Sequence, residues 1–140
     1  MMTDKIEEII ARDGFVLEMT VGNSMEPMLK NRQNPIVIEK ITRKPKKKDV
    51  VLFKRDTGEY VLHRIVKVYK DGYFICGDNR LGGDDGITDR HIIGILTGYY
   101  KGEKFIDCEK NLWYKLYSSW IVKYHYIRVL KDNICSIFKK

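Results

Sequence analysis

Alternating apolar and polar residues dominate the chain up to residue 108 and predict a series of short β-strands. The alternation is most regular in residues 60–69 and recurs in residues 36–41. Gly58, Gly72 and Gly102 fall between neighbouring runs, at the distance expected of tight hairpin turns. The predicted strands are residues 15–21, 36–41, 50–53, 60–69, 73–76, 92–100 and 104–107.

A short helix is predicted before the first strand, over residues 3–12. Ile6, Ile9 and Ile10 share one face of it, and Gly14 follows as a stop signal. Many short strands with tight turns are typical of a sandwich, a barrel or a coiled antiparallel sheet. We therefore expect a mainly β fold, a coiled, barrel-like antiparallel sheet with a short N-terminal helix and a C-terminal helix.

The pattern changes to a helical period after residue 109. Lys115, Lys123 and Lys131 lie off an apolar stripe whose members recur at steps of three or four. The stripe consists of Trp113, Leu116, Trp120, Tyr124, Ile127, Leu130, Ile134 and Phe138. Such a helix packs on its own sheet or lies in a membrane interface, and the pattern leaves both open. The predicted division is a β domain over residues 1–108 and a basic amphipathic helical tail over residues 109–140.

Composition indicates one folded domain with an uneven charge. The chain has 140 residues, of which 44% are hydrophobic and 32% charged, which excludes a collagen-like or low-complexity chain. Residues 110–140 contain seven basic residues and one acid, so this segment carries most of the net charge of +7. A second basic cluster occupies residues 43–48. Such charge is typical of a solvated face, or of a surface that meets nucleic acid, an anionic membrane or an acidic protein.

Targeting and metal signals are not evident in the sequence. Residues 1–12 contain acids and no apolar stretch, unlike a secretory signal, and no run approaches the roughly 18 apolar residues of a spanning helix. We therefore expect a cytoplasmic or peripherally membrane-associated protein. Cys76, Cys108 and Cys135 are widely spaced, which indicates free thiols rather than a disulfide framework or a zinc site. No cofactor or metal is expected.

Three segments depart from a generic β domain, and the first surrounds Ser24. Residues 22–29 read Gly-Asn-Ser-Met-Glu-Pro-Met-Leu and follow a predicted strand. A rigid turn there can project the serine hydroxyl and leave main-chain N–H groups free, as a nucleophile with an oxyanion site requires. The same composition is also typical of an ordinary turn.

The other two segments contain a histidine and several carboxylates. His63 lies in the middle of a predicted strand and is of interest as a base only if Ser24 is its neighbour. Residues 76–80 read Cys-Gly-Asp-Asn-Arg, and Asp84 and Asp85 follow two glycines. A carboxylate from this segment can orient the histidine in a serine triad, although glycines and acids at a strand end also form turns.

The order of these segments resembles the type I signal peptidase family and its relatives, the self-cleaving SOS-type repressors. The matching motifs are Ser-Met-Glu-Pro-Met-Leu at residues 24–29, Lys-Asp-Val-Val-Leu-Phe at 48–53, His-Arg at 63–64, Gly-Asp-Asn at 77–79 and Ile-Gly at 93–94. Together they cover about residues 15–100. One such motif is weak evidence, whereas several in the same order are specific.

The resemblance implies a serine endopeptidase on a coiled β fold, with Ser24 as the nucleophile and His63 as the base. Most bacterial members have lysine at the base position, and histidine is typical of the endoplasmic-reticulum-type branch. By the same resemblance, Asp84 or Asp85 is expected to partner the histidine, and Asp78 to hold the site together. The implied substrate is a peptide or preprotein with small residues before the cut.

This chain departs from the family at the oxyanion position. Gly22 stands where bacterial members usually carry a hydroxyl, so the main-chain N–H of Ser24, with the Asn23 side chain, is expected to bind the oxyanion. Met25 and Pro27 are expected on the substrate side of this loop. The spanning helices that tether family members are also not predicted here.

Two other functions are compatible with the sequence. A peptide-binding or scaffold module would keep the fold without turnover. A repressor-type self-cleaving domain would need Ala-Gly or Cys-Gly in a linker before the serine, whereas Ala11 precedes arginine and Cys76 lies inside the candidate site. An anionic membrane surface or a protein partner is expected to bind through residues 110–140, and no nucleic acid is expected.

Overall fold

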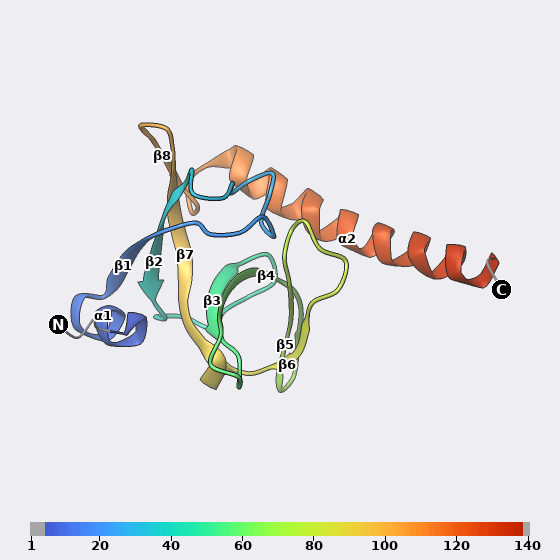
Figure 1. Cartoon of the computed structure of the whole chain (residues 1–140), viewed down its shortest axis with the longest axis horizontal. Coiled ribbons are helices and arrows are strands. Elements are labelled where there is room, and N and C mark those ends of the chain that lie inside the picture. The colour runs from blue at the N-terminus through green and yellow to red at the C-terminus, as the bar shows by residue number, and fades with distance from the viewer. Residues whose placement is uncertain (1–4, 139–140) are drawn as a thin grey trace.

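The computed structural model describes residues 5–138, so the first residues of the predicted helix and the end of the tail lie outside the described part. Strands form the body of the fold, and helices lie near its two ends (Figure 1). The elements are α1 (Ile6–Asp13), β1 (Phe15–Met19), β2 (Pro35–Lys40), β3 (Val50–Lys54), β4 (Tyr60–Tyr69), β5 (Gly72–Cys76), β6 (Asp84–Ile87), a 3-10 turn (Asp89–His91), β7 (Ile92–Lys101), β8 (Lys104–Asp107) and α2 (Leu112–Phe138).

The eight strands form one antiparallel sheet with the order β1-β2-β7-β3-β4-β5-β6, and β8 pairs with β7. The long β7 therefore joins two curled halves, one built on β1 and β2 and the other on β3 to β6 (Figure 1). The mainly β prediction is confirmed. The sheet is not closed into a barrel, because β1 and β6, the strands at its two edges, do not pair with each other in the described chain.

Strand β3 is buried on both faces and separates two parts of the core. Val50 and Leu52 belong to a cluster with α1, β1 and β2, whereas Val51 and Phe53 belong to a cluster with β4 and β5. Alternate residues of a strand point to opposite faces, so a continuous apolar run fits a strand with core on each side. This strand lies next to β4, which carries His63.

Helix α2 is one continuous helix of 27 residues that starts beside β8 and runs to the end of the molecule opposite α1 (Figure 1). Its inner face is buried at Tyr114, Ser118, Ile121, Val122 and His125. Ile121 and Val122 pack on Val66 and Cys76 of the sheet. Exposed members of the apolar stripe, such as Trp113, Trp120 and Ile127, lie on the other side of the helix, as described below.

Candidate active site

Ser24 and His63 lie together beside the sheet. Ser24 is in the loop that follows β1, and His63 is in β4. The Nε2 atom of His63 lies 3.0 Å from the Oγ atom of Ser24, which is a hydrogen-bond distance. The two residues are 39 positions apart, so only the tertiary fold brings them together.

The pairing of β3 with β4 determines where the imidazole lies. Val51 is opposite His63 and Phe53 is opposite Val61 in the antiparallel register. The rings of Phe53 and His63 meet edge to face, with their centroids 6.3 Å apart. These apolar neighbours hold the imidazole in place and shield it from water.

Gly77 lets the loop after β5 approach both members of the pair. A Cβ atom at this position would lie 2.6 Å from the main-chain oxygen of Ser24 and 3.1 Å from Nε2 of His63. The N–H of Asn79 donates to the same Ser24 oxygen at 2.9 Å. A side chain on Gly77 would therefore displace the loop, the serine or the imidazole.

Burial lowers the pKa of His63 to about 4, so the imidazole is neutral near pH 7. The negative charge of Asp84 opposes this shift, and the positive charge of Arg55 adds to it. A neutral imidazole accepts the Ser24 proton at Nε2 only when its own hydrogen is on Nδ1. Nδ1 is buried and has no hydrogen-bond partner among the described residues.

The carboxylates of Asp84 and Asp85 make other contacts. Both oxygens of Asp84 accept hydrogen bonds from Arg55, at 2.7 Å from Nε and 2.8 Å from Nη2, and this guanidinium holds the pKa of Asp84 below its usual range. Asp85 is exposed, and its carboxylate accepts the N–H of Gly86 at 3.0 Å. Among the described residues, His63 donates no hydrogen bond to either carboxylate.

Asp78 lies on the inner side of the site and is buried. Its two oxygens accept hydrogen bonds from Nε and Nη2 of Arg64 at 2.8 and 3.0 Å. The Tyr117 hydroxyl donates to Asp78 at 2.9 Å, and Ser118 of the same helix accepts from Arg64 at 2.7 Å. Arg64 follows His63 in β4 and Asp78 follows Gly77, so this ion pair ties together the segments that carry the site.

The residues expected at the oxyanion and substrate positions differ in exposure. Asn23 is exposed, and its side-chain oxygen accepts a hydrogen bond from Arg80 at 2.6 Å. Met25 is buried, and its sulfur accepts the N–H of Asp78 at 3.5 Å. Pro27 is exposed at the edge of a separate hollow. Gly22 has a φ of +88°, and its N–H donates to Asn31 rather than toward the site.

A groove of about 390 Å³ begins at Ser24 and His63 and runs between β1 and the start of β4. Its floor is apolar and includes Ile36, Ile38 and Leu52. β1 pairs only with β2, and β5 joins β4 only from Arg64 onward, so the walls keep unpaired main-chain edges within the described chain. An extended peptide can pair with such edges and present its side chains to the groove.

Three residues of this arrangement received no role in the sequence analysis. Gly77 and Arg64 were visible as parts of two motifs, and their positions beside the candidate residues were the available signal. Arg55 had no such signal, because it lies in the β3–β4 turn and reaches Asp84 only through the fold. Arg55 also bonds Glu59, so it links two acidic side chains near the groove.

A cysteine thiol and a metal ion are two other groups that could react near Ser24 and His63. Cys76 precedes Gly77, but burial raises the pKa of its thiol to about 11, which leaves it uncharged near pH 7. Within residues 5–138, no three His, Cys, Asp or Glu side chains are grouped so that they could hold a metal ion. Ser24 and His63 together offer a hydroxyl beside a neutral imidazole, a pairing used by nucleophilic hydrolases.

Part of the chain is similar to a known protein. No protein-family model matches the chain. The chain is similar to Signal peptidase I W of Bacillus subtilis (strain 168), with 31% identity over 93 residues, which is 61% of this chain and 48% of that protein. The chain thus spans about half the length of this curated relative. The similarity supports a signal-peptidase-like function at the level of the family.

The relation of the chain to a membrane was a further expectation from the sequence. Among the helices of residues 5–138, none has both the length and the apolar character that crossing a bilayer requires.

Proposed function

We propose that this chain is a serine endopeptidase of the signal-peptidase type, with Ser24 as the nucleophile and His63 as its base, as in the endoplasmic-reticulum-type branch. The observation that carries the proposal is the 3.0 Å approach of the imidazole to the hydroxyl at the end of an apolar groove. The similarity to a signal peptidase supports the reaction class. The substrate is a signal or leader peptide bound in an extended conformation along the unpaired strand edges.

In the proposed reaction, Nε2 of His63 takes the hydroxyl proton while Oγ of Ser24 forms a bond to the scissile carbonyl carbon. The main-chain N–H of Ser24 stabilises the oxyanion, assisted by the nearby Asn23 amide. His63 then gives the proton to the leaving amine, and the peptide C–N bond breaks. Water, deprotonated by the same imidazole, attacks the acyl carbonyl carbon, and the imidazolium returns the proton to Oγ of Ser24 as the ester C–O bond breaks.

Asp84 is the proposed acidic partner of His63. Among the charges that favour the imidazolium form, that of Asp84 acts most strongly. The contact of Asp84 with Arg55 competes with this role, because both carboxylate oxygens already accept hydrogen bonds. Asp78 is proposed to act as a positioning residue through Arg64, since its carboxylate is occupied by the guanidinium and Tyr117.

A cleavage assay tests the proposal. Signal-like and leader-like peptides are incubated with the full chain in lipid-free buffer, and the products are identified by mass spectrometry. We expect defined cuts that Ser24→Ala and His63→Ala each reduce by at least about a thousandfold. Ser119→Ala, which lies on α2 beside a different hollow, serves as the matched control and is expected to cut normally.

Two outcomes contradict the proposal. Cleavage by Ser24→Ala at the wild-type rate would assign the activity to another residue. Peptide binding without any cleavage, in lipid-free buffer and with vesicles added, would indicate a peptide-binding module with the same fold.

A further inference from the structure

Helix α2 exposes an apolar surface on the side away from the sheet. We call this surface the outer stripe, and its members recur at steps of three, four or seven along the helix. The outer stripe consists of Trp113, Leu116, Trp120, Ile127, Leu130 and Ile134. All six are exposed, and Trp113 keeps 80% of its surface accessible. Scattered apolar residues on a surface are normal, but six large exposed apolar residues along one face of a helix are typical of a binding surface.

The rotation of the helix explains why the stripe faces outward. Tyr114, Ser118 and His125 occupy the opposite side of α2 and are buried. Ser118 lies against the sheet because it accepts a hydrogen bond from the buried Arg64. The outer stripe lies opposite these buried residues on the helix and therefore faces solvent.

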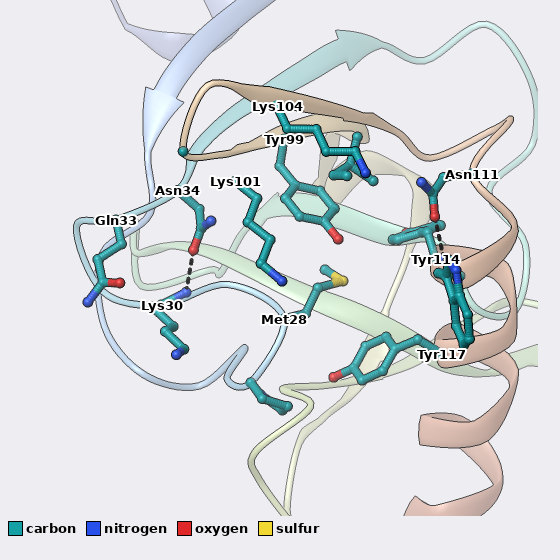
Figure 2. A pocket seen from close by; sticks show the side chains of 14 residues that line it. Met28, Lys30, Gln33, Asn34, Tyr99, Lys101, Lys104, Asn111, Tyr114 and Tyr117 are labelled. Atoms are coloured by element: carbon teal, nitrogen blue, oxygen red, sulfur yellow. Dashed lines mark hydrogen bonds between the residues drawn. The ribbon is translucent and has the colours of Figure 1, made fainter.

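Basic residues lie on both sides of the outer stripe at the start of α2. On one side, a hollow of about 600 Å³ is lined by Trp113 and by Lys30, Lys101 and Lys104. Figure 2 shows Lys101 and Lys104 beside Tyr99 in this hollow. On the other side, a hollow of about 440 Å³ is lined by Lys115 and a basic loop, with Asp49 and Glu109 as acidic neighbours. Asp49 pairs with Lys46 of this loop at 3.8 Å. The loop residues are Lys46, Lys47 and Lys48.

We propose that the outer stripe of α2 lies in the surface of an anionic lipid bilayer, with the lysines on its two sides contacting lipid headgroups. The stripe combines aliphatic side chains with two tryptophans, whose amphipathic rings favour the boundary between headgroups and acyl chains. Lysines beside such a stripe add attraction to anionic lipids. Residues 110–140 contribute seven basic residues and a single acid.

The charges favour a bilayer over other occupants of the same surface. A second copy of the chain would bring like-charged lysine borders together around the stripe, which opposes pairing. Nucleic acid would place its phosphates on the basic borders and leave the apolar row without a complementary surface. A bilayer satisfies both parts at once, because it offers an anionic surface over an apolar interior.

This membrane contact adjoins the candidate active site. Pro27 and Met28, from the loop that carries Ser24, line the same hollow as Trp113 and Lys104. Binding through the outer stripe would thus hold the Ser24 loop near the bilayer surface. The proposal does not depend on peptidase activity, since it concerns only the binding of the full chain to lipid.

Tryptophan fluorescence tests the proposal directly, because both tryptophans of the chain, Trp113 and Trp120, belong to the outer stripe. The probe is vesicles of phosphatidylcholine alone or with phosphatidylglycerol at a 7:3 ratio. We expect a blue shift and co-sedimentation with the anionic vesicles, and binding at least about tenfold weaker to the neutral ones. The binding is expected to weaken further as salt is added.

Two variants and one control locate the contact. Ile127→Gln combined with Leu130→Gln removes apolar area from the stripe and is expected to weaken binding by about tenfold or more. Lys46→Gln combined with Lys104→Gln removes one charge from each border and is expected to weaken binding to anionic vesicles only. Val68→Gln, at an exposed apolar position of β4, is the control and is expected to bind normally.

Three results would overturn the proposal. The first is equal binding to neutral and anionic vesicles. The second is unchanged binding of the Ile127→Gln, Leu130→Gln variant with a wild-type circular dichroism spectrum. The third is a lipid-free dimer in sedimentation experiments whose tryptophan emission is already blue-shifted, because this would assign the stripe to a second copy.

Discussion

Arg64 and Asp78 form a buried ion pair in which both carboxylate oxygens are engaged and each side chain is only 1% exposed. The pair joins β4 to the loop after β5, one residue beyond His63 and one residue beyond Gly77. The guanidinium also lies near the rings of Tyr114 and Tyr117, at 5.7 and 5.5 Å from their centroids. A charge buried in this way stabilises the site only while its partner is present.

Replacing one partner of this pair is therefore expected to be costly. Asp78→Asn leaves the Arg64 charge buried without a counterion, and we expect a loss of about 3–5 kcal/mol in the free energy of unfolding. Urea denaturation followed by circular dichroism measures this loss. Asp85→Asn, at an exposed carboxylate in the same region, is the control and is expected to change stability by less than about 0.5 kcal/mol. Equal effects in the two variants would contradict the role of the pair.

Gly77→Ala is expected to separate Ser24 from His63. The added Cβ would lie 2.6 Å from a main-chain oxygen and 3.1 Å from the imidazole, so the surroundings must move. We expect a cost of about 1–3 kcal/mol in stability and a loss of at least about a hundredfold in kcat/KM of the proposed peptidase. Gly82→Ala is the matched control, because its Cβ would meet no atom within 4 Å.

Because the His63 imidazole is buried, we expect the free energy of unfolding to fall in mild acid. Burial holds the pKa of His63 at about 4 in the folded chain, below its ordinary value of 6.5. Between these pH values the unfolded chain binds the proton and the folded chain does not, so stability decreases as pH falls. The contribution of His63 is at most about 3 kcal/mol.

Denaturant unfolding at a series of pH values measures this effect. His125 contributes in the same direction, because burial lowers its pKa as well. His63→Gln is therefore expected to keep only part of the pH dependence. A variant with the full wild-type dependence would show that His63 is not the titrating group.

Arg55 and Asp84 are expected to shift the pKa of His63 in opposite directions. Arg55→Gln removes a positive charge and releases the Asp84 carboxylate, so the pKa should rise from about 4 toward its ordinary value. Asp84→Asn removes the opposing negative charge, so the pKa should fall further. NMR titration of the histidine ring protons measures both shifts.

The same two variants should move the acid limb of the peptidase rate, to higher pH for Arg55→Gln and to lower pH for Asp84→Asn. Shifts in the same direction for both would contradict this account of the electrostatics.

The hydroxyl of Tyr117 is expected to stabilise the fold through Asp78. Tyr117→Phe removes a hydrogen bond of 2.9 Å to a buried carboxylate, and we expect a loss of about 1.5–3 kcal/mol. Thermal unfolding with and without the substitution measures it. Tyr124→Phe, on the same helix and partly exposed against Trp120, is the control and is expected to have little effect.

Much of the sheet could be predicted from the sequence because its strands alternate or form short apolar runs. Strand β6 was not predicted, because Asp84, Asp85 and Gly86 have low β propensity. That strand pairs with β5 through its main chain, while Arg55 neutralises one of its acids. Local pattern cannot reveal such a strand when long-range contacts stabilise it.

The candidate site could likewise be predicted only in part from the sequence. Ser24 and His63 were proposed from the order of the motifs, and the fold brings their side chains together. The contact between Arg55 and Asp84 depends on how β6 lies beside the β3–β4 turn, which sequence spacing does not determine. The outward position of the apolar stripe of α2 was also left open, because it depends on which side of the helix contacts the sheet. Ser118 and Ile121 lie on that side.

The contacts of α2 with the buried ion pair have a consequence for the order in which the protein is made. During translation the N-terminal part of a chain leaves the ribosome first. The segments that carry Ser24 and His63 therefore emerge before residues 112–138. Until the helix emerges, Arg64 lacks the Ser118 hydroxyl and Asp78 lacks the Tyr117 hydroxyl. In a nascent chain, Ser24 and His63 would therefore lie beside an ion pair that still lacks these two hydrogen bonds. A segment synthesised later thus completes the hydrogen bonds of a site whose other residues emerge earlier.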